Sequence, residues 1–221
     1  IRDPETLNAL LDSVRRFVRE RLIPAENEVA ETDQIPADIV RQMKDMGLFG
    51  LTIPEAYGGL DLTMEEESLT MIEMGRTSPA FRSVFGTTVG IGSMGIVMDG
   101  TPEQKSHWLP KMATGEVIAS FALTEPDAGS DAASLRTVAL RDGDHYVVNG
   151  TKRYITNAPH ASVFTLMARS NPADKGAGGV SAFIVDAKSP GITLGTIDRK
   201  TGQKGAHTCD VIFEDCRVPA A

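Results

Sequence analysis

The sequence predicts an α+β protein with two domains, an all-α helical N-terminal domain followed by an antiparallel β-barrel or sandwich domain. Up to about Gly115, apolar residues recur at helical spacing between capping residues. Beyond Gly115 they form short runs bounded by turn residues, with no helical segments between them. This pattern argues against alternating strand and helix units. We therefore expect a helical domain at 1–116 and a β-domain at 117–221.

The composition is that of an ordinary globular protein. Hydrophobic residues make up 41% and charged residues 24% of the 221 residues. There are 22 Lys and Arg against 30 Asp and Glu, which gives a formal net charge of −8. A nucleic acid, itself an anion, is therefore excluded as an expected partner.

Neither a membrane span nor a secretory signal is expected. The longest uncharged stretch, 83–98, contains four glycines and is shorter than the roughly 20 residues that a span needs. It predicts a buried helix. No apolar signal segment opens the sequence, and Cys209 and Cys216 are too few for a disulfide framework. We expect free thiols and a cytoplasmic (bacterial) or organelle-matrix location.

Capping residues predict the helices of the first half. Asp3-Pro4 opens the first helix, and Pro24 is expected to kink or end it. A second helix is predicted at 36–46, with Gly47 in the left-handed position after it. Gly58-Gly59 predicts a tight turn. Two capping boxes open helices at 64–76 and 102–113, namely Thr63 with Glu66 and Thr101 with Gln104.

Apolar runs predict the strands of the second half. They lie at 117–123, 135–141, 146–149, 163–168, 180–186, 192–197 and 208–213. Asp142-Gly143 and Asn149-Gly150 both have the composition of hairpin turns. The residues 171–179 predict a mobile surface loop.

The run 121–131 carries the strongest chemical signal. Gly129 permits a close backbone approach, and Ser130 adds a hydroxyl, so the loop is suited to a phosphate or pyrophosphate. A purely structural interpretation is also open, in which Pro126 and Gly129 turn the chain and Asp131 caps the segment after it.

Several motifs resemble one enzyme family. The run 121–131 resembles the signature of the acyl-CoA dehydrogenases, and Lys152-Arg153-Tyr154-Ile155-Thr156-Asn157 resembles their second flavin-contacting segment. Further similar stretches are 53–60, 183–192 and 213–219. The resemblance implies a helical domain, a middle β-domain and a C-terminal helical bundle. It also implies FAD and the oxidation of an acyl-CoA thioester to its trans-2,3-enoyl-CoA, with hydride transfer to flavin N5.

The resemblance also assigns residues to FAD. They are Phe121, Leu123, Thr124, Gly129, Ser130, Tyr154, Ile155 and Thr156. Leu123 and Thr124 would donate to the pyrimidine edge of the flavin, Gly129 and Ser130 would lie near the pyrophosphate, and the Thr156 hydroxyl near N5. Tyr154 departs from the family, which most often has tryptophan there.

For the substrate, the resemblance implies Ser130 and one face of the 83–98 helix. That face carries Val84, Thr87, Thr88 and Ile91; simple helix packing is the alternative for each. No catalytic residue is assigned, because the family's glutamate lies in the C-terminal bundle, which would begin beyond Ala221. Glu125 and Asp131 are interpreted as caps and turn anchors. His107, His145, His160 and His207 show no metal-binding spacing.

The implied partners are an acyl-CoA and electron transfer flavoprotein. A candidate docking patch for the latter surrounds Gly58-Gly59 and contains Met46, Leu48, Leu60 and Leu62; core packing is its alternative. The full-length protein is expected to be a homo-oligomer, a tetramer or dimer. Two other functions remain open, an acyl-CoA oxidase on the same scaffold and a non-catalytic flavin- or acyl-CoA-binding module.

Overall fold

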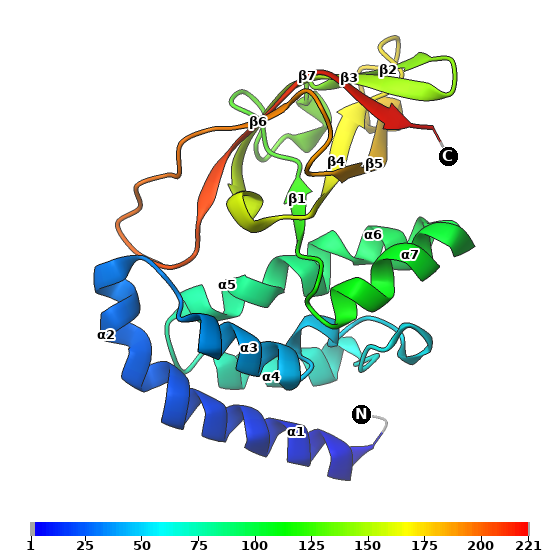
Figure 1. Ribbon diagram of the computed structural model, residues 1–221. Coiled ribbons are helices and arrows are strands. Elements are labelled where there is room, and N and C mark those ends of the chain that lie inside the picture. Colours follow the sequence, from blue (N-terminus) through cyan, green and yellow to red (C-terminus); the bar gives the residue numbers. More distant parts are fainter. Residues whose placement is uncertain (1–2, 221) are drawn as a thin grey trace. The chain divides into compact units, whose positions relative to one another are not determined.

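The computed structural model describes residues 3–220, and it consists of two compact units (Figure 1). The helical unit contains the chain up to Val117 together with Arg199–Ala206, and the sheet unit contains Ile118–Asp198 and the chain from His207 onward. The predicted fold class, helices followed by a β-domain, is confirmed. The sequence had not indicated that 199–206 packs with the helices.

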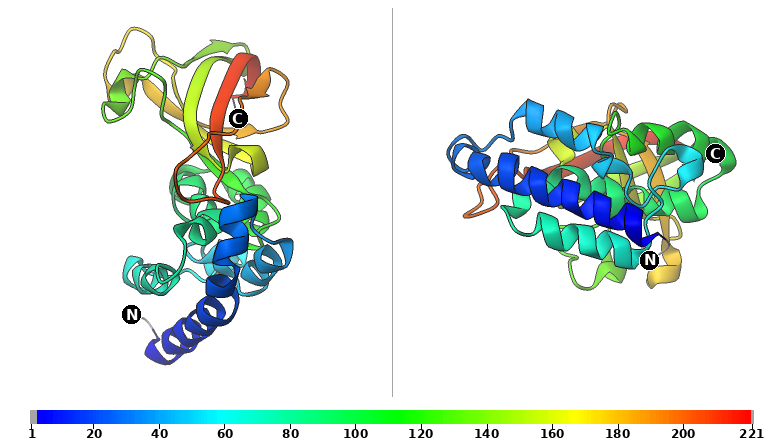
Figure 2. Two further views of the ribbon diagram at one scale, coloured as in Figure 1. Left: turned by 90° about the vertical axis from the view of Figure 1, so that its left-hand side faces the viewer. Right: turned by 90° about the horizontal axis from the view of Figure 1, so that it is seen from below.

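The first helical stretch contains α1 (Pro4–Phe17), a π-helical turn η1 (Val18–Leu22) and α2 (Ile23–Thr32). It lies along one side of the helical unit (Figure 2). Asp3 caps α1 by accepting hydrogen bonds from the backbone of Glu5 and Thr6. The π-turn carries the helix past Pro24, because Pro24 then falls in the first turn of α2, where no helical N–H bond is required.

The other helix ends follow the predicted caps. The elements are α3 (Ala37–Asp45), η2 (Leu48–Gly50), η3 (Glu55–Tyr57), α4 (Met64–Met74) and α7 (Pro102–Ala113). Both capping boxes form, and Gly47 has φ 72°. At the Gly58-Gly59 turn, a Cβ on Gly59 would lie 1.9 Å from the carbonyl oxygen of Ile53. Only glycine permits this approach.

One long helix contains the uncharged stretch. It is built from α5 (Pro79–Thr87), a π-helical turn η4 (Thr88–Gly92) and α6 (Met94–Asp99). At 21 residues it is long and apolar enough to cross a membrane by length and composition alone, contrary to the sequence estimate. A core helix passes the same test, and part of this helix is buried in the helical unit.

The sheet contains seven strands, β1 (Ala119–Ala122), β2 (Val138–Asp142), β3 (His145–Thr156), β4 (Val163–Arg169), β5 (Val180–Asp186), β6 (Ile192–Leu194) and β7 (Thr208–Pro219). Most of its pairings, namely β2–β3, β3–β7, β4–β5 and β6–β7, are antiparallel as expected. The sheet is nevertheless mixed. Strand β1 pairs with β4 in parallel, and β2 meets β4 in parallel at Val138 and Arg169. The cause is topological: β3 runs opposite to β2, and the chain reverses again between β3 and β4, so β4 runs in the same direction as β1 and β2.

Of the two predicted hairpin turns, one is confirmed and one is wrong. Gly143 and Asp144 connect β2 to β3. Asn149-Gly150 lies inside β3, which continues to Thr156 along β7 with a register shift at Gly150. Gly150 is nevertheless required, since its φ is 152° and a Cβ would lie 2.4 Å from the Thr137 hydroxyl.

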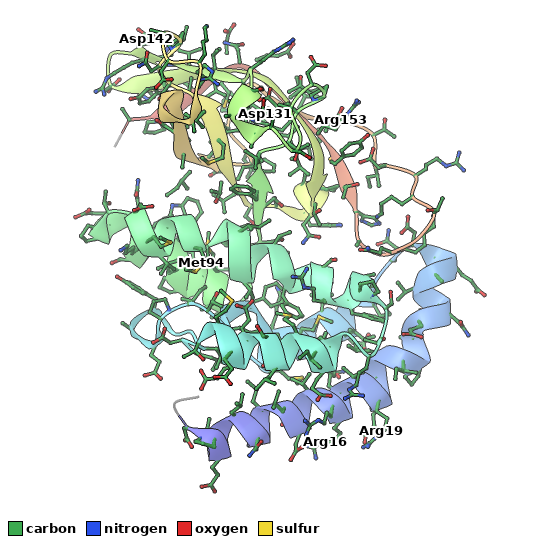
Figure 3. All side chains as sticks on the ribbon, turned by 180° about the vertical axis from the view of Figure 1, so that it is seen from behind. Arg16, Arg19, Met94, Asp131, Asp142 and Arg153 are labelled. Carbon is green, nitrogen blue, oxygen red and sulfur yellow. The ribbon has the colours of Figure 1, made fainter. Side chains whose placement is uncertain are left out.

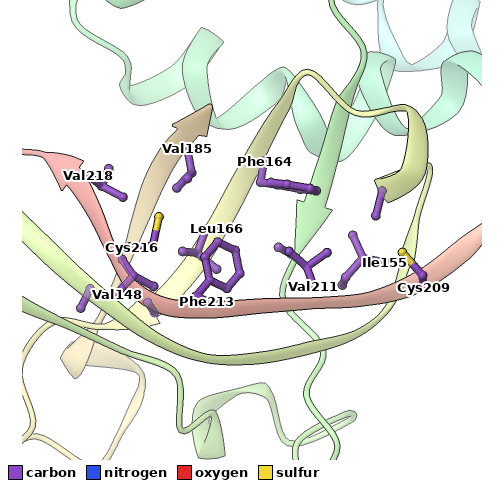
Figure 4. Close-up of a cluster of buried hydrophobic side chains, with 14 residues drawn as sticks. Val148, Ile155, Phe164, Leu166, Val185, Cys209, Val211, Phe213, Cys216 and Val218 are labelled. Atoms are coloured by element: carbon purple, nitrogen blue, oxygen red, sulfur yellow. The ribbon is translucent and has the colours of Figure 1, made fainter. Parts of the chain in front are cut away.

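The core of the sheet unit lies inside the curl of the strands. Side chains of β3, β4, β5 and β7 converge there, among them Val148, Phe164, Val185, Val211 and Phe213 (Figure 4). Cys209 and Cys216 are free and buried in this core. Burial, aided by the charges of Asp198 and Asp210, raises the pKa of the Cys209 thiol to about 11.

Candidate functional site

The loop after β1 is a rigid turn. Glu125 and Ala128 exchange two backbone hydrogen bonds, N–H to O distances of 2.9 and 3.3 Å, which place Pro126 and Asp127 at the tip. Gly129 and Ser130 come directly after this turn and are exposed. The loop therefore has a fixed backbone and an open side.

The Glu125 carboxylate anchors the loop on its buried side. Its side chain is 5% exposed and accepts from Lys152 Nζ at 2.7 Å. It also accepts from the backbone N–H groups of Arg136 at 2.6 Å and Thr137 at 2.9 Å. Burial raises the pKa of this carboxyl, but the hydrogen bonds from Lys152 and Thr137 and from the backbone outweigh burial, so its pKa lies below the ordinary value. Glu125 is a turn anchor, as the sequence interpretation expected.

Lys152 on β3 completes this buried pair. Its side chain is 0% exposed, and Nζ donates to the Leu123 carbonyl oxygen at 3.0 Å as well as to Glu125. Burial lowers the pKa of the Lys152 ammonium, and the Glu125 carboxylate partly offsets this. The cation thus binds both sides of Thr124 in the loop.

A bulge in β3 brings the second segment to the same loop. The pairing of β3 with β7 shifts between Lys152 and Ile155, and the Arg153 N–H donates to the Thr124 carbonyl oxygen at 2.8 Å. The Arg153 guanidinium pairs with Asp210 at 3.1 and 3.2 Å. Figure 3 shows Arg153 on this strand and Asp131 on the loop. The two segments singled out by sequence are therefore joined directly.

Tyr154 occupies the outer side of the bulge. Its φ is 59°, an uncommon backbone conformation for a bulky residue, and the residue is 62% exposed. The Arg153 guanidinium carbon lies 5.6 Å from the ring centroid. The backbone turn presents the aromatic ring outward and sends Ile155 into the core.

The open side of the site is rich in hydrogen-bond donors. Within residues 3–220, the structure gives no protein partner to the backbone N–H groups of Thr124, Gly129 and Ser130, nor to the hydroxyls of Thr124, Ser130 and Thr156. A Cβ on Gly129 would meet nothing within 4 Å. Phe121 and Leu123 are half-buried beside the loop. Ile155 is buried, so contact with a ligand there falls to its backbone.

Two family models match this chain. The acyl-CoA dehydrogenase N-terminal domain matches residues 4–116, and the acyl-CoA dehydrogenase middle domain matches residues 120–216. The chain belongs to the acyl-CoA dehydrogenase family. It is 38% identical over 208 residues to an acyl-CoA dehydrogenase of Bacillus subtilis, covering 94% of this chain and 55% of that protein. The chain therefore spans about half the length of such relatives.

Solved structures share this fold. A chain from "Electron transferring flavoprotein of Acidaminococcus fermentans: Towards a mechanism of flavin-based electron bifurcation" matches with a TM-score of 0.92 at 32% identity, covering 98% of this chain and 57% of that one. A glutaryl-CoA dehydrogenase from Mycobacterium smegmatis in complex with FADH2 matches with a TM-score of 0.84 at 33% identity, covering 99% and 54%.

The donors of the loop fit FAD. A flavin carries carbonyl and nitrogen acceptors along its pyrimidine edge, and a pyrophosphate accepts hydrogen bonds from backbone amides and hydroxyls. Thr124, Gly129, Ser130 and Thr156 offer donors of these kinds. The Glu125 carboxylate, which would repel phosphate, is buried and neutralised by Lys152.

The predicted substrate residues of the helical family domain do not share one environment. Thr88 is fully buried and Thr87 is buried, whereas Ile91 is 54% exposed. The π-turn η4 explains the difference, because it inserts an extra residue and rotates the positions after it away from α-helical spacing. Val84, in α5, is half-buried, and Ser130 belongs to the sheet unit.

The candidate docking patch for electron transfer flavoprotein is found only in part on the surface. In the candidate docking patch, Leu48 is fully buried and belongs to the core, so it cannot contribute to a surface. Leu60 is exposed, and Met46 and Leu62 are half-buried. Among the described residues, no group of three or more His, Cys, Asp or Glu side chains is placed to hold a metal ion.

Sequence reasoning missed Lys152. The sequence did contain a sign that Lys152 is buried. Val148, Gly150 and Lys152 are two residues apart, so they lie on the same face of β3, and Val148 is in the core. A lysine at such an inward position requires a buried partner.

Proposed function

We propose that the chain supplies the helical and middle domains of an FAD-dependent acyl-CoA dehydrogenase, which oxidises an acyl-CoA thioester to its trans-2,3-enoyl-CoA. One observation carries the proposal. In a chain of this family, the loop 123–131 and the segment 152–156 are locked together while their donors stay free on one side.

The residues of the loop and of the second segment each have a role toward the cofactor. Leu123 and Thr124 would hold the pyrimidine edge, Gly129 and Ser130 would hold the pyrophosphate, and the Thr156 hydroxyl would serve N5. Phe121, Tyr154 and the backbone of Ile155 flank the ring system. Bound at these residues, FAD would supply a hydride acceptor for the β-hydrogen of the acyl group. Donors at the pyrimidine edge favour reduction because they stabilise the negative charge that it places there.

No residue of this chain is assigned as the base that removes the α-proton. The Glu125 carboxylate is buried and fully engaged by Lys152 and two backbone amides. Asp131 is exposed and accepts from the Ser134 hydroxyl as the anchor of the adjoining turn. Both carboxylates hold the loop in place and have no proton-transfer task.

The acyl-CoA is held by Ser130, at its pantetheine arm, and by the helix containing Val84, Thr87, Thr88 and Ile91. Electron transfer flavoprotein is the proposed electron acceptor, and the active protein is a homo-oligomer. Support for the acceptor is the similarity to a chain from a structure of an electron transferring flavoprotein.

Anaerobic mixing of the flavin-loaded product of the complete reading frame with short, medium and long acyl-CoAs tests the reaction. Bleaching of the visible flavin band by at least one acyl-CoA is expected. A protein that holds FAD but is bleached by none would be a binding module. In a second step, faster reoxidation of the flavin by oxygen than by electron transfer flavoprotein would make it an oxidase.

A further inference from the structure

The Leu123–Thr124 peptide group links the buried ion pair to the open face of the site. Its carbonyl oxygen accepts a hydrogen bond from Lys152 Nζ at 3.0 Å. Its N–H, on Thr124, is one of the donors that have no protein partner within residues 3–220. One planar group therefore joins a buried cation on one side to a free donor on the other.

A cation on a carbonyl oxygen changes the other end of the same peptide. It withdraws electron density through the amide resonance and makes the N–H a stronger donor. Cooperative strengthening in such chains is about 10–30% per bond, and the low dielectric around a fully buried lysine favours its upper range.

We propose that Lys152 is a positioning residue that polarises the Leu123–Thr124 peptide and so raises the reduction potential of the flavin. This inference rests on the proposed function, in which the Thr124 N–H faces the pyrimidine edge. Lys152 touches neither cofactor nor substrate, and it acts through one peptide group. The Glu125 carboxylate, 2.7 Å away, holds the ammonium in place and favours its charged form.

The neighbouring donor provides an internal reference. The Gly129 N–H belongs to the peptide whose carbonyl, that of Ala128, accepts from the Glu125 N–H at 2.9 Å. A neutral backbone donor, not Lys152, engages that carbonyl. A change confined to Thr124 therefore reports the cation, and an equal change at Gly129 reports a general movement of the loop.

The first measurement needs no flavin. The amide ¹H and ¹⁵N resonances of Thr124 and Gly129 are compared in the 221-residue chain and in Lys152→Met, Lys152→Arg and the double variant Lys152→Met with Glu125→Gln. The two variants without a cation at position 152 are expected to shift the Thr124 resonances to lower frequency more than those of Gly129. Lys152→Arg, which keeps a cation there, is expected to keep the parent values.

The second measurement uses the flavin-loaded product of the complete reading frame. Loss of the cation is expected to weaken binding of reduced flavin about tenfold more than that of oxidised flavin, which lowers the midpoint potential by about 30 mV. The double variant leaves no unpaired buried charge, so its melting temperature should recover while its potential stays low. Val185→Ala, a core change away from the loop, controls for lost stability.

The outcomes separate the two proposals. If the parent protein holds no flavin, the proposed function fails, and the amide resonances still test the polarisation. If flavin is bound and the potential recovers together with the melting temperature in the double variant, Lys152 is only structural and the inference is wrong. Equal shifts at Thr124 and Gly129 would overturn it as well.

Discussion

Each unit contains a buried glutamate with cationic partners, and the two differ in where the cations lie. In the helical unit Glu73 is 7% exposed and pairs with Arg15 at 3.0 Å and Arg76 at 2.7 Å, whose side chains are 48% and 63% exposed. In the sheet unit the partner of Glu125 is Lys152, with no exposed surface at all. The distances are alike, and the surroundings are not.

The two sites differ in whether water can solvate the carboxylate once its cation is removed. When an exposed arginine is removed, water reaches the carboxylate and solvates it, so little is lost. When Lys152 is removed, the carboxylate stays buried with two backbone donors and no counter-ion. The ion pairs of Glu73 therefore add little to the stability of the helical unit. The pair of Glu125 with Lys152, in contrast, is required for the loop to keep its conformation.

Removal of the buried cation should have the largest effect. We expect Lys152→Met to lower the free energy of unfolding by about 3–5 kcal/mol, because it leaves an uncompensated charge in the sheet unit. Arg76→Met is the matched change in the helical unit and should cost at most about 1 kcal/mol. Urea unfolding of the two variants measures both, and equal losses would remove the distinction.

Acid should affect the sheet unit through Glu125. Its folded pKa is lowered, so it stabilises the fold above its ordinary value of 4.5, and this stability is lost as the pH falls through the lowered folded pKa. Between about pH 6 and 3 the melting temperature of Glu125→Gln should therefore fall less steeply than that of the parent protein. At pH 6 the melting temperature of the variant should already be the lower of the two. A parallel decline in parent and variant would contradict the assignment.

Salt should distinguish the two glutamates. The hydrogen bond from Arg15, together with Arg76, lowers the pKa of Glu73, but both arginines are open to solvent. The loss in Glu73→Gln, about 1 kcal/mol or less at low ionic strength, should shrink in about 1 M salt, where the Debye length is near 3 Å. The loss in Glu125→Gln should persist, since no ions reach that pair.

The smallest effect on stability is expected on the open side of the loop. A Cβ at Gly129 meets nothing within 4 Å, so Gly129→Val should change the free energy of unfolding by no more than about 0.5 kcal/mol. The same side chain would stand in the proposed approach of the cofactor and weaken FAD retention. Flavin titration with Gly202→Val, another open glycine, as control tests this; unchanged FAD affinity would place the cofactor elsewhere.

Local signals predicted local structure well. The capping boxes at Thr63 and Thr101, the left-handed Gly47 and the β2–β3 turn each depend on residues close in sequence, and all are found. Long-range features were not accessible in this way. The parallel partner of β1 is separated from it by a whole hairpin, and Gly150 resembles a turn residue although it is needed for a close approach to Thr137.

The candidate site also combines features that the local sequence predicted with long-range contacts that it did not. The resemblance located the loop 121–131 and the segment 152–157, because their composition is distinctive. It did not reveal that Lys152, Glu125 and the Arg153 backbone fasten the two together, since these contacts join positions about thirty residues apart only in the folded sheet. The π-turn η4 likewise has no sequence signature, and it alters which helix positions share a face.

The short segment 199–206 makes the helical unit discontinuous in the gene. Its Gly205 N–H donates to the Asp33 carboxylate at 2.6 Å, and a Cβ on Gly205 would lie 2.8 Å from Val29 and 2.9 Å from Ile35. A single recombination crossover near residue 117 would thus replace the helices but leave behind the segment that packs against the end of α2. Exchange of one unit between relatives requires this segment to change with it, which couples the evolution of sequences that lie more than eighty residues apart.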